Sequence, residues 1–174
     1  TGLEFPLDCL PPDGRHLVEI ARPRPSGSSS SAAVQSYIQS QFSPKFWDFE
    51  RDSHLLEETP AGSITFTNLI FTSKVKKPKR IMIAAHYDSK VLEAHAMDNL
   101  SKDELRKLLE ESKFIGATDS AFSCALMVSL AQELEASLDA SAEFSLQFVF
   151  FDGEEAMIHW TEADSLYGSR SLAS

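Results

Sequence analysis

The order of apolar and polar positions along the chain predicts its elements of regular secondary structure. Apolar residues at helical spacing predict three helices, over residues 32–42, 102–112 and 120–137. Apolar or alternating runs predict four strands, over residues 45–52, 63–73, 81–85 and 144–151. The sequence Pro60-Ala61-Gly62 supplies a turn between the first two strands.

The later elements alternate between strand and helix, and the strands at 81–85 and 144–151 are apolar enough to be predicted as buried. Such strands are typical of a sheet that helices cover on its faces. We therefore predict an α/β fold with a mixed, centrally parallel sheet flanked by helices. Residues 1–31 are rich in proline and serine and are predicted to form an irregular N-terminal arm, whereas residues 32–174 belong to a single domain.

Acidic residues follow the last of these strands directly. The apolar run that ends at Phe151 is followed by Asp152, Gly153, Glu154 and Glu155. Ligands of open α/β sheets bind at the carboxyl ends of the strands. Two adjacent glutamates repel each other there unless a cation lies beside them, so the pair predicts a metal ion.

Two further groups of polar residues follow other predicted elements. His86 and Asp88 come directly after the strand at 81–85, and Asp119 lies at the start of the helix at 120–137. Carboxylate and imidazole groups suit zinc. One glutamate of the pair can then bind the metal while its neighbour transfers protons.

Each of these residues also has an ordinary structural interpretation. Asp119 could cap a helix, Asp88 could stabilise a turn, and His86 could be a hydrogen-bonded core histidine. Glu154 and Glu155 could begin a solvated loop or helix. The prediction of a site therefore rests on the ordered set and not on any single residue.

Composition narrows the classes of partner. The net charge of −10 argues against nucleic acid or an anionic membrane surface as a partner. No apolar stretch is long enough to span a bilayer, and no signal peptide is visible after Thr1. Cys9 and Cys124 do not settle the redox compartment, and nothing in the sequence indicates the oligomeric state.

Four motifs together resemble the animal-type glutaminyl-peptide cyclotransferases, or glutaminyl cyclases. They are His86–Lys90, Gly116–Ala121, Phe150–Ala156 and the stretch from His159 to Arg170. The resemblance covers roughly residues 24–174. It implies the α/β/α fold of the zinc aminopeptidases, and it makes residues 32–174 the N-terminal portion of a single zinc-dependent catalytic domain.

The resemblance also implies roles for individual residues. Asp119 and Glu155 would bind a single Zn²⁺, Glu154 would be the general acid and base, and Trp160 would line the substrate pocket. The substrates implied are peptides or proteins with an N-terminal glutamine, whose α-amine attacks its own side-chain amide and expels ammonia. The resemblance further implies the secretory pathway.

The sequence departs from the family pattern at several positions. The third zinc ligand of the family is a histidine far downstream, so we expect this chain alone to bind zinc weakly and to be inactive. Ala85 stands where secreted members have a cysteine, so their disulfide to the position of Cys124 is not expected here. Residues 91–113 resemble an insertion beside the pocket.

Two other functions remain open at this point. A zinc aminopeptidase of the same clan would bind two metals, with His86 as a ligand. The residues Ser120–Ser123 after Asp119 differ from the pattern usual in those enzymes, which favours the cyclase. A non-catalytic remnant of the fold is the other possibility, although retention of Asp119, Glu154 and Glu155 argues against it.

Overall fold

The protein is built on a four-stranded mixed sheet. The computed structural model describes residues 14–97, 99–138 and 143–174. The strands are β1 (Trp47–Thr59), β2 (Gly62–Ser73), β3 (Arg80–His86) and β4 (Ser145–Phe151), in the spatial order β1-β2-β4-β3. β2 is antiparallel to both β1 and β4, whereas β3 is parallel to β4. The predicted mixed α/β fold is therefore confirmed, with the parallel pair formed by the two strands that precede the polar motifs.

The two strands of the parallel pair differ in burial. β4 lies between β2 and β3, and its residues Phe148, Val149 and Phe150 are fully buried, as predicted. The prediction that the strand at 81–85 is buried was wrong for the chain as described, since Ile81 and Met82 are 44% and 54% exposed. β3 is an outer strand of this four-stranded sheet, so neighbouring strands cover it on one side alone.

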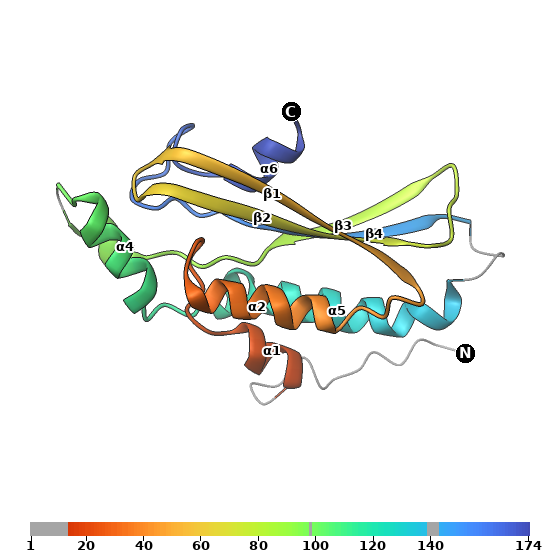
Figure 1. Cartoon of the computed structure of the whole chain (residues 1–174). Coiled ribbons are helices and arrows are strands. Elements are labelled where there is room, and N and C mark those ends of the chain that lie inside the picture. Colours follow the sequence, from red (N-terminus) through yellow and green to blue (C-terminus); the bar gives the residue numbers. More distant parts are fainter. Residues whose placement is uncertain (1–13, 98, 139–142) are drawn as a thin grey trace.

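Helices lie on both faces of this sheet (Figure 1). The α-helices are α1 (Arg15–Ile20), α2 (Ser29–Ser40), α3 (Leu92–His95), α4 (Lys102–Glu111), α5 (Phe122–Leu134) and α6 (Tyr167–Leu172). A kinked turn, η2 (Ala117–Ala121), with non-helical backbone at Asp119 and Ser120, precedes α5, and a 3₁₀ turn, η3 (Glu135–Ser137), follows it. α2 and α5 lie under one face with α1 below them, and α6 lies on the opposite face. Within the described ranges, no helix is long and apolar enough to cross a membrane.

The helix predicted to begin at residue 32 begins three residues earlier. Ser28 has an extended backbone conformation, and its side chain accepts a hydrogen bond from the Ser31 amide at 3.1 Å. This is the usual N-cap arrangement, so part of the serine run forms the cap and first turn of α2. The polar helix predicted at 102–112 is α4, and a capping box between Ser101 and Glu104 fixes its start.

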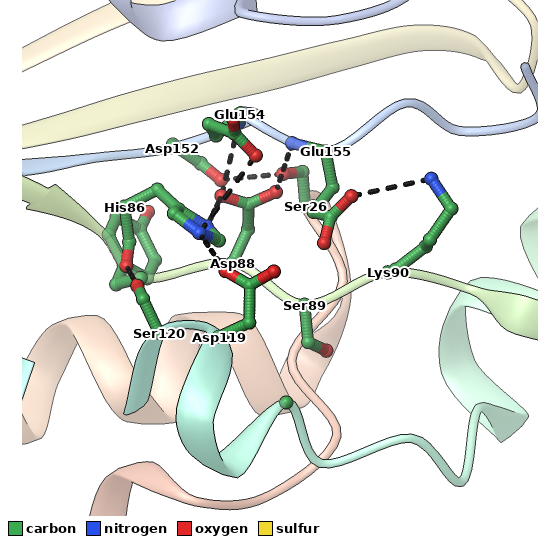
Figure 2. Close-up of polar contacts among 12 residues, drawn as sticks. Ser26, His86, Asp88, Ser89, Lys90, Asp119, Ser120, Asp152, Glu154 and Glu155 are labelled. Atoms are coloured by element: carbon green, nitrogen blue, oxygen red, sulfur yellow. Dashed lines mark hydrogen bonds and ion pairs between the residues drawn. The ribbon is translucent and has the colours of Figure 1, made fainter. Parts of the chain in front are cut away.

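The prediction of an irregular arm was wrong for much of the segment that the structure describes. α1 forms within it, and residue Arg24 is fully buried. The Ser26 hydroxyl donates to Asp152 Oδ1 at 2.6 Å, which attaches the segment to the end of β4 (Figure 2). A six-residue helix has too few turns to give a clear period, and its stability comes from packing. Residues 1–13 lie outside the described residues, and the division of the chain at residue 31 stays a prediction.

Aromatic rings fill the core between the sheet and α2. Phe42, which follows α2, packs against Phe71 of β2 and against Phe148 and Phe150 of β4. Trp47 at the start of β1 meets Phe148 edge to face, with ring centroids 5.4 Å apart. Burial of each such side chain contributes about 2–3 kcal/mol. This packing fixes β2 and β4 and therefore the positions of the loops at their ends.

The predicted insertion at 91–113 packs as a second, smaller core. Leu105 and Leu109 of α4 pack in a cluster with Phe66 of β2. Arg106 Nε donates to the carbonyl oxygen of Ala61 at 2.7 Å, so α4 also holds the tip of the β1–β2 hairpin. Within the described chain, this segment therefore supports the hairpin.

Candidate active site

The parallel pairing of β3 and β4 brings two polar motifs together. His86 is the register partner of Phe151, and the Tyr87 amide continues the pairing by donating to the Phe151 carbonyl at 2.8 Å. The chain segments that follow both strands therefore leave the sheet side by side. The predicted convergence of the histidine motif with the paired glutamates is present in the structure (Figure 2).

Asp88 holds the paired glutamates through their main chain. Its Oδ1 accepts from the Glu154 amide and its Oδ2 from the Glu155 amide, each at 3.1 Å. The turn also requires Gly153, which has φ +63°, because a Cβ there would lie 2.4 Å from the Phe66 ring. One buried carboxylate therefore holds the main chain of both glutamates at the end of β4.

His86 lies among three carboxylates. Its Nε2 is 2.8 Å from Asp119 Oδ1 and 3.9 Å from Glu154 Oε2, and its Nδ1 is 3.3 Å from Asp88 Oδ1. Burial alone would lower the pKa of His86. Hydrogen bonds to Asp88 and Asp119 and the negative charges around the ring outweigh burial and raise that pKa to about 9. An imidazolium therefore offsets part of the acidic charge at neutral pH.

The two adjacent glutamates have different surroundings. The Glu154 side chain is 31% exposed and faces His86. The Glu155 side chain is 12% exposed, and its Oε2 lies 3.3 Å from Lys90 Nζ. Burial and the neighbouring carboxylates raise the pKa of both, whereas His86 acts in the opposite direction on Glu154 and Lys90 on Glu155. The pair is thus chemically unequal before any ligand binds.

Asp119 is the middle residue of η2, the turn that precedes α5. Gly116 adopts φ +49°, and its carbonyl accepts the Ala121 amide at 3.1 Å. The next residue after Asp119, Ser120, is joined to it by a cis peptide bond, and its hydroxyl donates to the His86 carbonyl. The η2 turn therefore packs against the end of β3. The Asp119 side chain remains 68% exposed and lies beside His86.

The donor chemistry of the site suits zinc only in part. Asp119 and Glu155 supply carboxylates from two different segments, and Figure 2 draws Asp119 against His86 and Glu155 against Lys90. Over residues 14–97, 99–138 and 143–174, no group of three His, Cys, Asp or Glu side chains is arranged to hold a metal. Two carboxylates alone do not complete a zinc site, so a metal here would need at least one further ligand.

Trp160 lies five residues after Glu155, in the same chain segment. Its side chain is 55% exposed, on the loop between β4 and α6. The carboxylate of Asp164 organises this loop by accepting the amides of Met157, Ile158 and His159 at 2.8–3.1 Å. The structure thus fixes the loop that carries Trp160, while a contact of its indole with substrate stays a prediction.

Three contacts that shape the candidate site were not predicted from the sequence. The bidentate role of Asp88, the pairing of Lys90 with Glu155 and the loop-forming role of Asp164 all depend on tertiary positions. All three residues stand inside the family motifs, but a motif does not identify the partner of each residue. Asp164 in particular has a type and position that are equally typical of an exposed turn.

Cys124 has no disulfide partner within the described part of the chain. It is a fully buried free thiol in α5, and it donates to the His86 carbonyl at 3.1 Å. Burial raises its pKa to about 12, so this thiol is protonated and unreactive at neutral pH. Cys9 lies outside the described residues.

Comparisons with known proteins agree with the motifs. The model of peptidase family M28 matches residues 68–174. The chain is 37% identical to a glutaminyl-peptide cyclotransferase from Dictyostelium discoideum, over 91% of this chain and 44% of that protein. It is 39% identical to the enzyme of the same name from Gloydius blomhoffii, over 84% of this chain and 39% of that protein.

Solved structures give the same result. The crystal structure of Macrostomum lignano glutaminyl cyclase superposes with a TM-score of 0.69 at 36% identity, over 91% of this chain and 44% of that one. This chain therefore spans less than half the length of these relatives. The chain belongs to peptidase family M28, and within it the chain resembles the glutaminyl-peptide cyclotransferases, as its motifs predicted.

Proposed function

We propose that the protein to which this chain belongs is a zinc-dependent glutaminyl-peptide cyclotransferase. It would convert the N-terminal glutamine of peptides or proteins to pyroglutamate and release ammonia. The observation that best supports this proposal is the unequal pair Glu154 and Glu155, which Asp88 holds through two adjacent amides. The similarity to cyclotransferases over most of the chain supports the same reaction.

Asp119 and Glu155 are the proposed zinc ligands. They lie on separate segments, Asp119 in η2 and Glu155 in the turn after β4, and carboxylates of this kind would hold a zinc ion. When bound, zinc would supply a Lewis acid for the side-chain amide of the substrate. Because two carboxylates make an incomplete site, we expect the isolated chain to bind zinc weakly and to show no turnover.

Glu154 is the proposed general acid and base. The reaction forms a bond between the α-nitrogen of the substrate and its side-chain amide carbon, and breaks the bond from that carbon to the amide nitrogen. Glu154 would accept the proton that the attacking amine loses and return it to the departing ammonia. The imidazolium of His86, 3.9 Å from Glu154 Oε2, favours the ionised carboxylate that the first step needs.

Substrate orientation is the proposed role of Trp160. An exposed indole on a loop that Asp164 fixes offers an apolar surface at little cost in conformational entropy. Confinement of the glutamine in its reactive conformer would supply part of the rate enhancement.

The secretory pathway is the localisation that the family resemblance supports, although the disulfide implied for secreted members is replaced here by Ala85 and the free thiol of Cys124.

The direct test is an assay of the full-length protein with a glutamine-led peptide. We expect release of ammonia and a peptide product whose N-terminus is blocked, and we expect no reaction with the same peptide led by alanine. Release of free glutamine would identify an aminopeptidase instead. No conversion of either peptide by protein that contains stoichiometric zinc would overturn the proposed reaction.

A further inference from the structure

Arg24 is a fully buried arginine whose hydrogen bonds go to main-chain carbonyls. Its Nε donates to the carbonyl of Tyr87, and its Nη1 donates to the carbonyls of Arg22, at 3.1 Å, and Ile115. Its Nη2 donates to the carbonyl of Gly116 at 3.1 Å. The planar, fork-shaped donor set of a guanidinium suits such an interaction with several segments at once.

These acceptors belong to two segments that carry site residues. Tyr87 immediately precedes Asp88, and Ile115 and Gly116 lead into the turn that presents Asp119. The main chain of Arg24 strengthens the first connection, because its amide donates to Ser89 Oγ at 2.9 Å and its carbonyl accepts the Ser89 amide at 3.3 Å. Arg24 thus joins the segment of Asp88 to the segment of Asp119.

The charge of Arg24 also has a place in the site. A buried cation without a carboxylate in direct contact is costly, unless negative groups nearby offset its charge. Burial lowers the pKa of Arg24, and the negative charges of Asp88, Asp119 and Glu155 act in the opposite direction. These three carboxylates also repel one another, so the positive charge of Arg24 and the negative charges of the carboxylates stabilise each other.

We propose that Arg24 is a positioning residue for the metal site, holding the Asp119 turn against the Asp88 segment. This inference rests on the proposed zinc site. It also explains why a proline- and serine-rich segment far from the motifs in sequence packs against the active site. Arg24 touches neither substrate nor metal in this arrangement.

The test compares zinc affinity in the full-length protein and its variants by competition with a chelator. Arg24→Lys keeps the positive charge but loses the planar set of guanidinium donors. Arg24→Met loses both the charge and these donors. We expect zinc affinity to fall by about 10-fold in Arg24→Lys and by about 100-fold in Arg24→Met, which are the limits typical of residues that orient metal ligands. Hydrogen exchange of the amides in residues 115–121 should accelerate in both variants.

A matched control separates positioning from general loss of stability. Ile38→Ala removes buried apolar atoms from α2, a helix that supplies no residue to either segment, and should lower Tm without changing zinc affinity. Ser89→Ala deletes one bond to Arg24 and should lower zinc affinity by about threefold to tenfold, with the fold intact. Ser89→Ala decides the question if the Arg24 variants do not fold.

The outcomes separate the two proposals. Wild-type protein that binds no zinc would overturn the proposed metal site. Wild-type protein that binds zinc, together with folded Arg24 variants whose affinity is unchanged or falls only as much as that of Ile38→Ala, would overturn the role of Arg24. Unchanged zinc affinity in Ser89→Ala when the Arg24 variants do not fold would do the same.

Discussion

Two aspartates, Asp88 and Asp164, do similar work in neighbouring turns. Each is buried, and each accepts hydrogen bonds from the amides of consecutive residues. Asp88 accepts those of Glu154 and Glu155, and Asp164 accepts those of residues 157–159. Such arrangements satisfy main-chain donors that would otherwise be buried without partners. The two turns are separated by only one residue, yet they carry different chemistry.

The difference lies in where each aspartate comes from. Asp164 lies five to seven residues from the amides it accepts, so it shapes its own loop. Asp88 lies 66 and 67 residues from its partners and follows a different strand. It also contacts His86, which in turn contacts Asp119. Asp164 thus stabilises the loop in which it lies. Asp88, in contrast, connects three segments that are distant in sequence and so forms the site.

Replacement of Asp88 should have the largest effect. Asp88→Asn removes the charge and places an amide group against main-chain donors, so we expect the free energy of unfolding to fall by about 3 kcal/mol and zinc affinity to fall with it. Urea denaturation of the full-length protein measures the change in stability. Asp103→Asn, at an exposed residue of α4, is the matched control and should change the free energy of unfolding by less than about 0.5 kcal/mol. Equal stability of the Asp88 and Asp103 variants would show that the hydrogen bonds of Asp88 do not stabilise the site, and would contradict the contrast drawn between Asp88 and Asp164.

Replacement of Asp164 should have a smaller, local effect. Asp164→Asn weakens the amide bonds and the bond from the Tyr167 hydroxyl, which is 2.8 Å long. We expect a loss of about 1–2 kcal/mol in the free energy of unfolding. Because the loop carries Trp160, the KM for glutamine-led peptides should rise while zinc affinity stays at the wild-type value. A loss of zinc affinity as large as that in Asp88→Asn would show that the two turns are not independent.

Replacement of Trp160 should have the smallest effect on stability. With its side chain 55% exposed, Trp160→Ala should change the free energy of unfolding by less than about 0.5 kcal/mol. KM should rise several-fold, because the substrate would no longer pack against the indole ring. Leu55→Ala, at a residue 59% exposed on β1, is the control and should leave KM unchanged. An unchanged KM in Trp160→Ala would exclude Trp160 from the substrate pocket.

The pattern of apolar residues was sufficient to predict the main elements of the fold. The predicted strand at 144–151 is β4, and the predicted strand at 81–85 is β3, because both are short apolar runs bounded by polar residues. The acidic turn at the end of β4 could likewise be located, since its position after a buried strand is itself the signal. Convergence of this turn with His86 followed from parallel pairing.

What the sequence could not supply were contacts set by tertiary packing. An arginine between two prolines gives no sign that it is buried, and Arg24 was therefore assigned to an irregular arm. The unequal surroundings of Glu154 and Glu155 depend on His86 and Lys90, each more than 60 residues away in sequence. The family resemblance assigned their roles, and the geometry provides a physical reason why they differ.

The assignment of different roles to the paired glutamates is the central claim, and one measurement tests it most directly. Zinc content and ammonia release are compared in full-length Glu154→Gln and Glu155→Gln. We expect Glu154→Gln to retain zinc and to lose about 10²–10⁴-fold in turnover, since it lacks the group that transfers protons. Glu155→Gln should lose zinc. Wild-type turnover in Glu154→Gln, or wild-type zinc affinity in Glu155→Gln, would contradict the account.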